Sequence, residues 1–403
     1  MIGAGVMGRC YMEAADRRGL RVELIEHPSR FDEYRHLAAV QHPVGGRAEE
    51  YWTRAAIDVL DSCRPDAVLG FAEPHVLAAA TAQARLGLPG ASLEAALASR
   101  NKGMQRLLFE RAGLPQPEFV IGRRPAELLQ WAAERFPVVV KPLNGSGSAG
   151  VVLAGSTETL SPILAQRTEV SSVLLETYVD GPEYSWEGIV SDGTVRFGNF
   201  TAKHTTGPPQ FVELAHVLPH AFPARDLSYL EQVIQRAVTA VGMDTGLVHL
   251  EFRLGQAGPS IMEVAVRTPG DHIFEMLGIA YGIDFAGILI DLALGLAPDL
   301  PGAGPAGPVA AVAFLTSPPG RVERVVGVDE VRRRDDVLRA ELRFQPGDVV
   351  PELRSSNERC GYVLLRSPDT VAVRRALAEV RRTVRIETSP QRGAPLALPE
   401  ENK

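Results

Sequence analysis

The stretch Val248–Arg267 reads VHLEFRLGQAGPSIMEVAVR, and it decides the fold that we expect. Two runs with alternating apolar and polar residues flank a turn at 255–259, which is typical of a β-hairpin with one buried face. The expected apolar face comprises Val248, Leu250, Phe252, Leu254, Met262, Val264 and Val266. The other face carries His249, Glu251, Arg253, Glu263, Ala265 and Arg267. If the chain turns back near Ala257, Glu251 lies directly opposite Glu263.

Two carboxylates in this arrangement need compensation. Like charges directly opposite each other destabilise a sheet by roughly 0.2–1 kcal/mol. Mg²⁺ is the simplest compensation, because it binds one or two carboxylates together with substrate phosphates. Arg267 lies two positions beyond Glu263 on the same face, where it could donate a bidentate pair to a phosphate. The alternative is a solvated hairpin face with scattered charge.

Length and composition exclude several classes of protein. A chain of 403 residues suggests two to four domains, and its 45% hydrophobic content is ordinary for a globular protein. The net charge of −7 argues against a nucleic-acid partner. No apolar run approaches a membrane span and no signal peptide is visible, so we expect no membrane partner. Cys10, Cys63 and Cys360 fit neither a disulfide framework nor a zinc site, which favours the reducing cytoplasm.

The chain opens on a glycine turn, GAGVMG at 3–8, followed by a helical stretch at 9–18 and a strand at 21–26. This pattern resembles the dinucleotide-binding fingerprint, with Glu26 near the ribose-reading position. It supports an alternative function, an NAD(P)-linked oxidoreductase. The same turn also serves any α/β domain that needs a tight connection. The strand that normally precedes such a turn is missing, so either the start codon is assigned too late or that strand has been lost.

The first α/β unit continues with a predicted strand at 66–71 and a helix at 75–86, and it ends near Gly90. Glu73 lies just past the strand, where open α/β sheets place ligand contacts. It could equally be an acid at a helix N-terminus, stabilised by the helix dipole. A further helix is predicted at 99–112. Lys102 lies in its first turn, where a cation is unfavourable, so Lys102 is of more interest than a surface lysine.

A glycine-rich loop, LNGSGSAG at 143–150, separates predicted strands at 138–141 and 151–153. Successive N–H groups in such a loop can form an anion-binding nest. The loop lacks the GK[ST] ending of a P-loop and leads into a strand, so it is not a Walker A site. With Lys141 at its base we favour a phosphate lid over a flexible hairpin tip.

Further strands are predicted at 173–176, 184–190 and 194–200, the last two joined by an Asp192-Gly193 turn. A polar loop follows at 203–209, and then Glu213 and His216, three residues apart. A lone histidine is more often structural than catalytic. Helices are expected at 273–277 and 285–294, after a loop at 269–272.

The Pro/Gly-rich segment 300–308 marks a boundary. Beyond it we expect short strands and an amphipathic helix at 370–382, without recognisable chemistry. Residues 389–403 are expected to be disordered.

Six of these stretches, in this order, resemble the ATP-grasp superfamily over almost the whole chain. The likeness is strongest to the carboxylate–amine ligases that include bacterial L-amino-acid ligases, which make dipeptides. The stretches are FPVVVKP, NGSGSAGV, LLETYVDGPEYS, KHTTGPPQFVELAHVLP, VHLEFRL and IMEVAVRTPGD. One departure is Ala265, where many ATP-grasp enzymes carry a metal-binding Asn. The amino-acid ligases resemble this chain in having a small residue there, which leaves the coordination of a second Mg²⁺ open.

The resemblance implies a role for each candidate residue. The ATP phosphates would be held by Lys102 and Lys141 and covered by a lid with Gly145, Ser146, Gly147, Ser148 and Gly150. The hinge that reads adenine, largely through backbone groups, would be Glu176, Tyr178 and Val179, and Glu183 would bind the ribose. Mg²⁺, or Mn²⁺ in its place, would be bound by Glu251 and Glu263, while Arg267 steadies the transferred phosphoryl group. The substrates would contact Glu73, Glu213, His216, Gly270, Asp271 and His272, with Glu213 or His216 accepting the proton of the amine.

The resemblance also implies a fold and an activity. The fold would be α/β and α+β, beginning with a Rossmann-like parallel-sheet domain at 1–95. An ATP-grasp domain at 96–300 would follow, with a lid subdomain at about 115–180 and a catalytic core at about 181–300, and a C-terminal α+β domain at 301–388. The activity would be amide formation between a carboxylate and an amine, both small molecules and both expected to be amino acids; the alternatives are the NAD(P)-linked oxidoreductase and a non-catalytic nucleotide-binding module. Amide formation would proceed through an acyl phosphate with release of ADP, and a homodimer is the default assembly.

Overall fold

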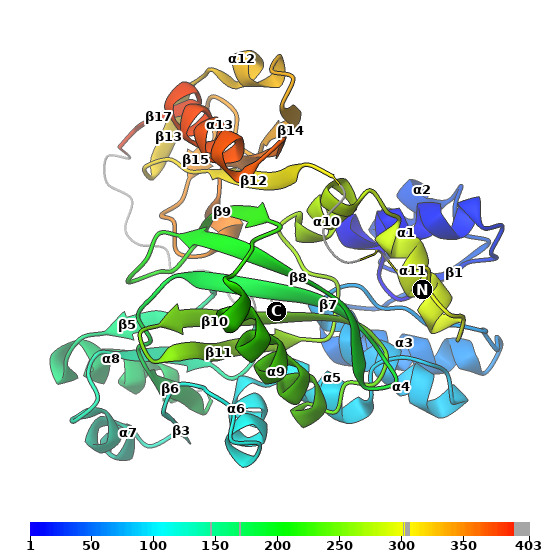
Figure 1. Cartoon of the computed structure of the whole chain (residues 1–403), viewed down its shortest axis with the longest axis horizontal. Coiled ribbons are helices and arrows are strands. Elements are labelled where there is room, and N and C mark those ends of the chain that lie inside the picture. Colours follow the sequence, from blue (N-terminus) through cyan, green and yellow to red (C-terminus); the bar gives the residue numbers. More distant parts are fainter. Residues whose placement is uncertain (146, 169–170, 301, 303–306, 391–403) are drawn as a thin grey trace.

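The computed structural model describes residues 1–145, 147–168, 171–300, 302 and 307–390, with only the backbone of residues 6 and 168. The described residues form four β-sheets with helices packed around them (Figure 1). The largest sheet has eight strands in the order β11-β10-β7-β8-β9-β12-β16-β14. It runs through the centre of the molecule and carries the predicted hairpin at one edge, so it positions most of the site.

The predicted hairpin is confirmed as β10 (Gly246–Gly255) and β11 (Gly258–Ala265), joined at Gln256 and Ala257. The antiparallel register pairs Glu251 with Glu263. A meander of three strands extends the sheet from β10, namely β7 (Glu183–Ser191), β8 (Thr194–Thr205) and β9 (Glu213–Leu218). β8 is longer than predicted and includes Lys203, which we had assigned to a loop.

One face of the hairpin is apolar, as predicted. Val248, Leu250 and Phe252 are at most 1% exposed and pack against helix α9 (Ala224–Ala240). We did not predict this helix, although Leu230, Val233, Ile234 and Ala237 recur at helical spacing and are all buried.

A β-bulge changes the expected faces of β11. After the Glu251–Glu263 pair, the register shifts so that Phe252 pairs with Ile261. Met262 is therefore the extra residue, and it lines the cleft instead of the core. Our placement of Met262 on the apolar face was wrong, because one inserted residue reverses the alternation of side chains.

The lid sheet has four strands in the order β3-β6-β4-β5. Its strands are β3 (Phe119–Gly122), β4 (Val138–Pro142), β5 (Val152–Ala154) and β6 (Val173–Thr177). Helices α7 (Pro125–Ala132) and α8 (Thr157–Thr168) cover one face, where Leu128, Leu160 and Leu164 form its core. The strands predicted at 138–141 and 173–176 are confirmed, and the one predicted at 151–153 begins one residue later.

The predicted helix at 99–112 is two helices in the structure. α5 (Leu93–Arg100) ends at Asn101, and α6 (Lys102–Arg111) begins there. The Asn101 side chain accepts a hydrogen bond from the Met104 amide and so caps α6. Lys102 is therefore the first residue of α6, and its backbone amide donates to the Leu143 carbonyl in the glycine loop.

The N-terminal unit contains a parallel pair of strands, β1 (Glu23–Glu26) and β2 (Val40–Pro43). Its helices are α1 (Gly5–Arg17), η1 (Pro28–Arg30), α2 (Phe31–Tyr34), α3 (Glu49–Leu60), η2 (Glu73–His75) and α4 (Val76–Leu86). The prediction of a strand at 66–71 is wrong. In this range only Gly70 makes a β-bridge, an isolated parallel one with Ile2, and Ile2 forms a second isolated bridge with Ile25.

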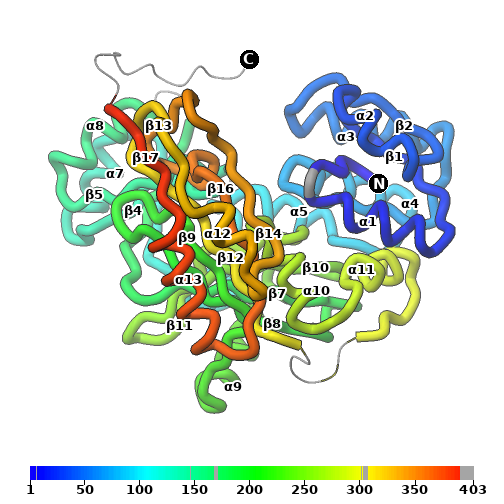
Figure 2. Tube along the Cα trace, turned by 90° about the horizontal axis from the view of Figure 1, so that it is seen from above, coloured from blue at the N-terminus to red at the C-terminus, as the bar shows by residue number. Residues whose placement is uncertain are grey.

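The C-terminal part continues the central sheet with β12 (Val309–Leu315), β14 (Val337–Leu342) and β16 (Gly361–Ser367). Its remaining elements are β13 (Gly320–Val326), α12 (Val328–Arg332), β15 (Val349–Val350), η3 (Ser356–Glu358), α13 (Thr370–Thr383) and β17 (Arg385–Ser389). Most of the expected boundary at 300–308 lies outside the described residues, and the sheet is continuous across it. Figure 2 shows this part lying over the β7–β9 region and apart from the N-terminal unit.

Of the tail expected at 389–403, residues 391–403 lie outside the described residues, and Ser389 ends strand β17.

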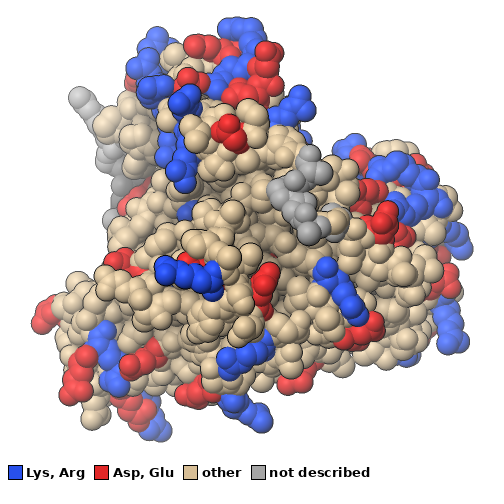
Figure 3. All heavy atoms as spheres, in the orientation of Figure 1, with Lys and Arg blue, Asp and Glu red and all other residues tan. Residues whose placement is uncertain are grey.

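Two further features concern the helices and the surface. Among the described residues, no single helix is long and apolar enough to cross a membrane. By length and composition only, α10 (Ile273–Tyr281) and α11 (Phe285–Ala293) meet that criterion as a pair, and they are bent by 104°. On the face shown in Figure 3, acidic and basic side chains are interspersed.

Candidate active site

A cleft lies between the lid sheet and the β10–β11 hairpin. Glu251 and Glu263 both line this cleft from the hairpin, and Lys102 of α6 and Lys141 of β4 line it as well. A second cleft adjoins it and also contains Glu251, together with residues of the N-terminal unit and the C-terminal part. The elements that contribute to these two clefts are spread over most of the chain.

Lys102 links one acid of the hairpin to the glycine loop. Its Nζ lies 3.0 Å from Glu263 Oε1 and donates to the Gly145 carbonyl at 2.8 Å. Because Lys102 is the first residue of α6, its side chain reaches the cleft from a fixed helix end. The conflict with the helix dipole noted in the sequence is thus offset by the Glu263 carboxylate.

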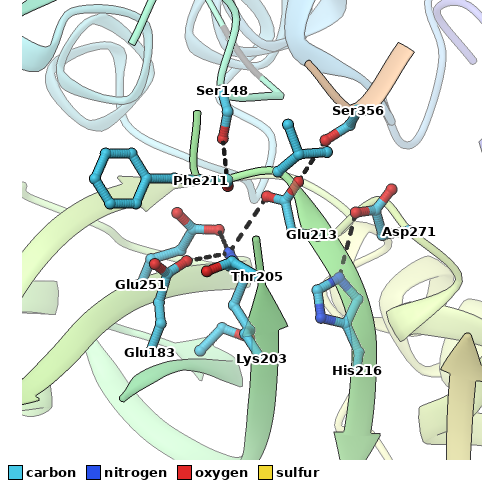
Figure 4. Close-up of polar contacts among 12 residues, drawn as sticks. Ser148, Glu183, Lys203, Thr205, Phe211, Glu213, His216, Glu251, Asp271 and Ser356 are labelled. Atoms are coloured by element: carbon cyan, nitrogen blue, oxygen red, sulfur yellow. Dashed lines mark hydrogen bonds and ion pairs between the residues drawn. The ribbon is translucent and has the colours of Figure 1, made fainter. Parts of the chain in front are cut away.

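Lys203 is the centre of a buried cluster that the sequence analysis missed (Figure 4). Its Nζ lies 2.5 Å from Glu251 Oε1, 2.9 Å from Glu183 Oε1 and 3.7 Å from Glu213 Oε1. Burial alone would lower the pKa of Lys203, but these three carboxylates outweigh it and raise the pKa well above its ordinary value. The amino-acid composition could have drawn attention to Lys203, because lysine is scarce in this chain. Its only lysines are Lys102, Lys141, Lys203 and Lys403.

His249 of the hairpin lies between Glu251 and a second buried acid, Glu187. His249 Nδ1 lies 3.0 Å from Glu187 Oε1, and His249 Nε2 lies 3.2 Å from Glu251 Oε1. Burial alone would lower the pKa of His249, but the hydrogen bonds to the two acids outweigh it and raise the pKa to about 9. Glu187 also accepts from Ser185, Thr201 and Asn199, so the polar network behind Glu251 is well satisfied.

Lys141 is held by Glu176 at the back of the cleft. Its Nζ lies 2.6 Å from Glu176 Oε2, and the other carboxylate oxygen pairs with Arg106. Arg106 also donates to the backbone carbonyls of Ile261 and Met262, at the bulge of β11. Burial would raise the pKa of Glu176, but the charges of Arg106 and Lys141 lower it to about 2. The Glu176 carboxylate is therefore engaged within the protein.

The expected adenine hinge borders an aromatic corner of the cleft. The Tyr178 ring stacks near Phe211 with centroids 6.0 Å apart, and the guanidinium of Arg253 lies over both rings. Arg253 donates to the Val179 carbonyl at 3.0 Å and lies 3.0 Å from Glu183. The Tyr178 amide already donates to Pro137.

Arg267 connects the hairpin to the N-terminal unit. It pairs with Glu73, whose other oxygen lies 2.6 Å from Arg100. Burial would raise the pKa of Glu73, but Arg267 and Arg100 outweigh it and lower the pKa. Glu73 lines the second cleft, and both of its oxygens are paired, so it orients Arg267.

The wall of the second cleft comes from β9 and the C-terminal part. His216 Nε2 lies 3.2 Å from Asp271 Oδ2, and Asp271 also pairs with Arg359 at 2.5 Å. Ser356 donates to the Glu213 carboxylate. We expected no recognisable chemistry in the C-terminal part, and tertiary folding brings 356–359 beside Glu213 and Asp271, which are 88–143 positions away.

Two models of known protein families match parts of this chain. An ATP-grasp domain model matches residues 134–274, and a model of the L-amino acid ligase C-terminal domain 2 matches 313–389. A D-alanine–D-alanine ligase of Gloeobacter violaceus is 30% identical over 222 residues, which cover 50% of this chain and 70% of that protein. The chain belongs to the ATP-grasp family.

Two other proteins resemble the chain over more of its length. Carnosine synthase 1 of Gallus gallus is 28% identical over 357 residues, which cover 80% of this chain and 38% of that protein. The crystal structure of the L-amino acid ligase from Bacillus licheniformis matches with a TM-score of 0.81 at 23% identity, covering 94% of this chain and 95% of that one, which confirms the fold. The chain spans 38–64% of the length of several of the curated relatives that it matches.

Most predicted site residues of this ATP-grasp protein come together in the two clefts. His272 lines neither; its ring packs against Tyr362 at 4.0 Å, and Nδ1 lies 3.3 Å from Glu275. Gly150 is not among the residues that line the clefts, and Ser146 lies outside the described residues.

The glycine turn at the N-terminus gives no support to the oxidoreductase alternative. A Cβ on Gly3 would lie 1.9 Å from the ring of His75, so that ring fills the space over the turn. Glu26, the expected ribose acid, accepts the amides of Gly5 and His27 at 3.0 and 2.7 Å.

Glu251 and Glu263 fit a divalent cation only if a bound substrate supplies the remaining oxygen ligands. Within the described residues, no group of three or more His, Cys, Asp or Glu side chains is arranged to hold a metal. Two facing carboxylates are nevertheless the protein share that Mg²⁺ typically uses when substrate phosphates complete its coordination. Lys203 pairs with Glu251 and Lys102 pairs with Glu263, which shows that both carboxylates attract a positive charge.

Proposed function

We propose that this ATP-grasp protein joins a carboxylate to an amine at the expense of ATP, and that both substrates are amino acids. The observation that carries the proposal is the pair Glu251–Glu263, which faces a cleft with Lys102, Lys141 and Arg267. The names of relatives, carnosine synthase and D-alanine–D-alanine ligase, support an amino-acid substrate. ATP would lie in the first cleft, and the second would hold the amino acids.

The reaction is two transfers. A carboxylate oxygen attacks the γ-phosphorus of ATP, the bond to the β–γ bridging oxygen breaks, and ADP leaves with that oxygen. The nitrogen of the amine then attacks the acyl carbon, the carbon–oxygen bond to phosphate breaks, and inorganic phosphate leaves as the amide forms. Lys102, Lys141 and Arg267 would bind the phosphoryl oxygens, where negative charge accumulates.

Two further tasks belong to the protein. The attacking ammonium group must lose a proton, and Glu213 or His216 would accept it; both lie in the second cleft. Water must be kept from the acyl phosphate, which the glycine loop over the cleft would achieve. Mg²⁺, or Mn²⁺ in its place, would be held by Glu251 and Glu263 and supplies charge neutralisation to the phosphates.

A screen for ADP release over pairs of amino acids, with mass spectrometry of the products, tests this function. ADP release that needs two amino acids, together with a product mass lower by one water than their sum, is the expected result. ADP release without an amide, or no release with any pair, contradicts it.

Assembly and location remain predictions of the same proposal. We expect a homodimer, which light scattering of the purified chain would show. A cytoplasmic location agrees with the need for ATP and with the free thiols of Cys10, Cys63 and Cys360.

A further inference from the structure

A short turn of the C-terminal part contacts two catalytic segments at once. This turn, η3, begins at Ser356 and projects over the second cleft. The Ser356 amide donates to the Gly147 carbonyl in the glycine loop at 3.3 Å. The Ser356 hydroxyl donates to Glu213 Oε2, as Figure 4 shows. One residue thus binds both the loop that would cover the phosphates and the acid expected near the amine.

The turn is itself held by several contacts. Ser355 and Glu358 form a capping box, in which the Ser355 amide donates to Glu358 at 2.7 Å. Arg359 donates from Nε to the Ser356 carbonyl at 2.9 Å and is fixed by Asp271 and by the ring of Phe314. The position of Ser356 is therefore set by contacts other than the two that it makes across the cleft.

Glu213 has few other partners. Its second oxygen, Oε1, lies 3.7 Å from Lys203, which is longer than an ordinary hydrogen bond. Lys203 itself lies closer to Glu251 and Glu183. Within the described residues, the Ser356 hydroxyl is therefore the principal group that orients the Glu213 carboxylate.

We propose that Ser356 is a positioning residue that holds Glu213 and the glycine loop in one shared arrangement. The inference rests on the proposed ligase function. The Gly147 carbonyl accepts from the Ser356 amide, and the Ser356 hydroxyl directs Glu213 into the second cleft, where the amine would lie. Acyl phosphate is then formed where the amine can attack it and water cannot. Without this link, water attacks the acyl carbon, phosphate leaves, and the original carboxylate returns with ATP consumed.

The first experiment measures the ratio of ADP released to amide formed, in the full chain, with the best amino-acid pair. Ser356→Ala removes the hydroxyl and should raise this ratio about tenfold, the equivalent of one hydrogen bond to a charged group. Ser356→Thr retains a hydroxyl and should restore a ratio near that of the wild type. Ser317→Ala is the matched control, because it removes a hydroxyl of the C-terminal part that donates to the Pro318 and Ile386 carbonyls and contacts neither Glu213 nor Gly147, and its ratio should stay near that of the wild type. Equal ratios for Ser356→Ala and the wild type, or equal increases in Ser356→Ala and Ser317→Ala, overturn the proposal.

A second measurement isolates the backbone contact and needs no turnover. Ser356 is the first residue of its turn, a position that accepts proline, so Ser356→Pro removes the amide donor with little strain. Hydrogen exchange of the glycine loop is compared with and without AMP-PNP and Mg²⁺. The protection by nucleotide should be weaker in Ser356→Pro than in Ser356→Ala. Equal protection in both overturns the link to Gly147. A wild-type chain that forms no amide instead contradicts the proposed function.

Discussion

The Nζ atom of Lys203 lies 2.5 Å from Oε1 of Glu251, with the lysine side chain only 2% exposed. A strand residue that we had placed in a polar loop is thus the main cation beside an expected metal ligand. It also joins Glu251 to Glu183 and Glu213, which are expected to serve the ribose and the amine. The three functions of the cleft therefore meet at one buried charge.

Replacing Lys203 by Met should lower the free energy of unfolding by about 3–5 kcal/mol, because it leaves buried carboxylates without their cation. Urea unfolding measured without metal or nucleotide gives this value. The double variant Lys203→Met/Glu251→Gln should recover part of the loss. A single variant within about 1 kcal/mol of the wild type contradicts this account.

Replacing Glu263 by Gln should reduce the rate of amino-acid-dependent ADP release by at least about 100-fold, because the cation that neutralises the phosphates loses one of its two carboxylates. Glu231→Gln, on the exposed side of α9, is the matched control and should be neutral. Full turnover in Glu263→Gln would remove the metal role of the hairpin.

Replacing Arg106 by Leu should destabilise the chain by about 3–5 kcal/mol, since Glu176 loses a buried partner and two backbone carbonyls lose their donor. The measurement is again urea unfolding. Arg106→Lys should recover little, because an ammonium group cannot reproduce the planar fork of a guanidinium. Full stability in Arg106→Lys would show that charge alone matters.

ATP with Mg²⁺ should raise the midpoint of thermal unfolding, whereas NADH should not. A ligand present at 100 times its dissociation constant stabilises a protein by about 2.7 kcal/mol. The expectation for NADH rests on the His75 ring over the turn at Gly3 and on the engaged Glu26. Stabilisation by NADH alone would revive the oxidoreductase alternative.

His75 should make the chain less stable in mild acid. Burial lowers the pKa of His75 from 6.5 to about 4, so its contribution is complete above pH 6.5 and is lost as the pH falls through 4. The shift corresponds to about 3 kcal/mol. His75→Phe cannot take up this proton, so its unfolding free energy should fall less between about pH 7 and pH 4. Parallel pH profiles of the two proteins would contradict this assignment.

The local sequence pattern was sufficient to predict those parts of the fold that depend on neighbouring residues. The alternation around Glu251 and Glu263 predicted the hairpin and the pairing of these two acids. The register next to the turn, where Phe252 pairs with Ile261, differs by one residue from the one that we expected, and the bulge restores the Glu251–Glu263 pair. The bulge at Met262 was not predictable in this way. At the bulge, the Ile261 and Met262 carbonyls accept from Arg106, which lies on a helix more than 150 positions earlier.

Some residues of the candidate site could also be predicted from local sequence, and others could not. Motif residues such as Lys102, Lys141 and Arg267 were identifiable, because each stands in a short stretch with its own spacing. Ser356 and Arg359 were not, because nothing in their local sequence indicates a partner. The scarcity of lysine in the chain was an available signal for Lys203 that we did not use.

The sequence by itself determined the hairpin, the glycine loop and the order of the motifs, because these depend on residue periodicity and backbone freedom over a few positions. Only the tertiary structure decided which charges are partners, that Glu73 holds Arg267, and that Ser356 reaches Glu213. The physical reason is that an ion pair depends on distance in space and on burial. Both are set by the packing of sheets and helices that lie far apart in the chain.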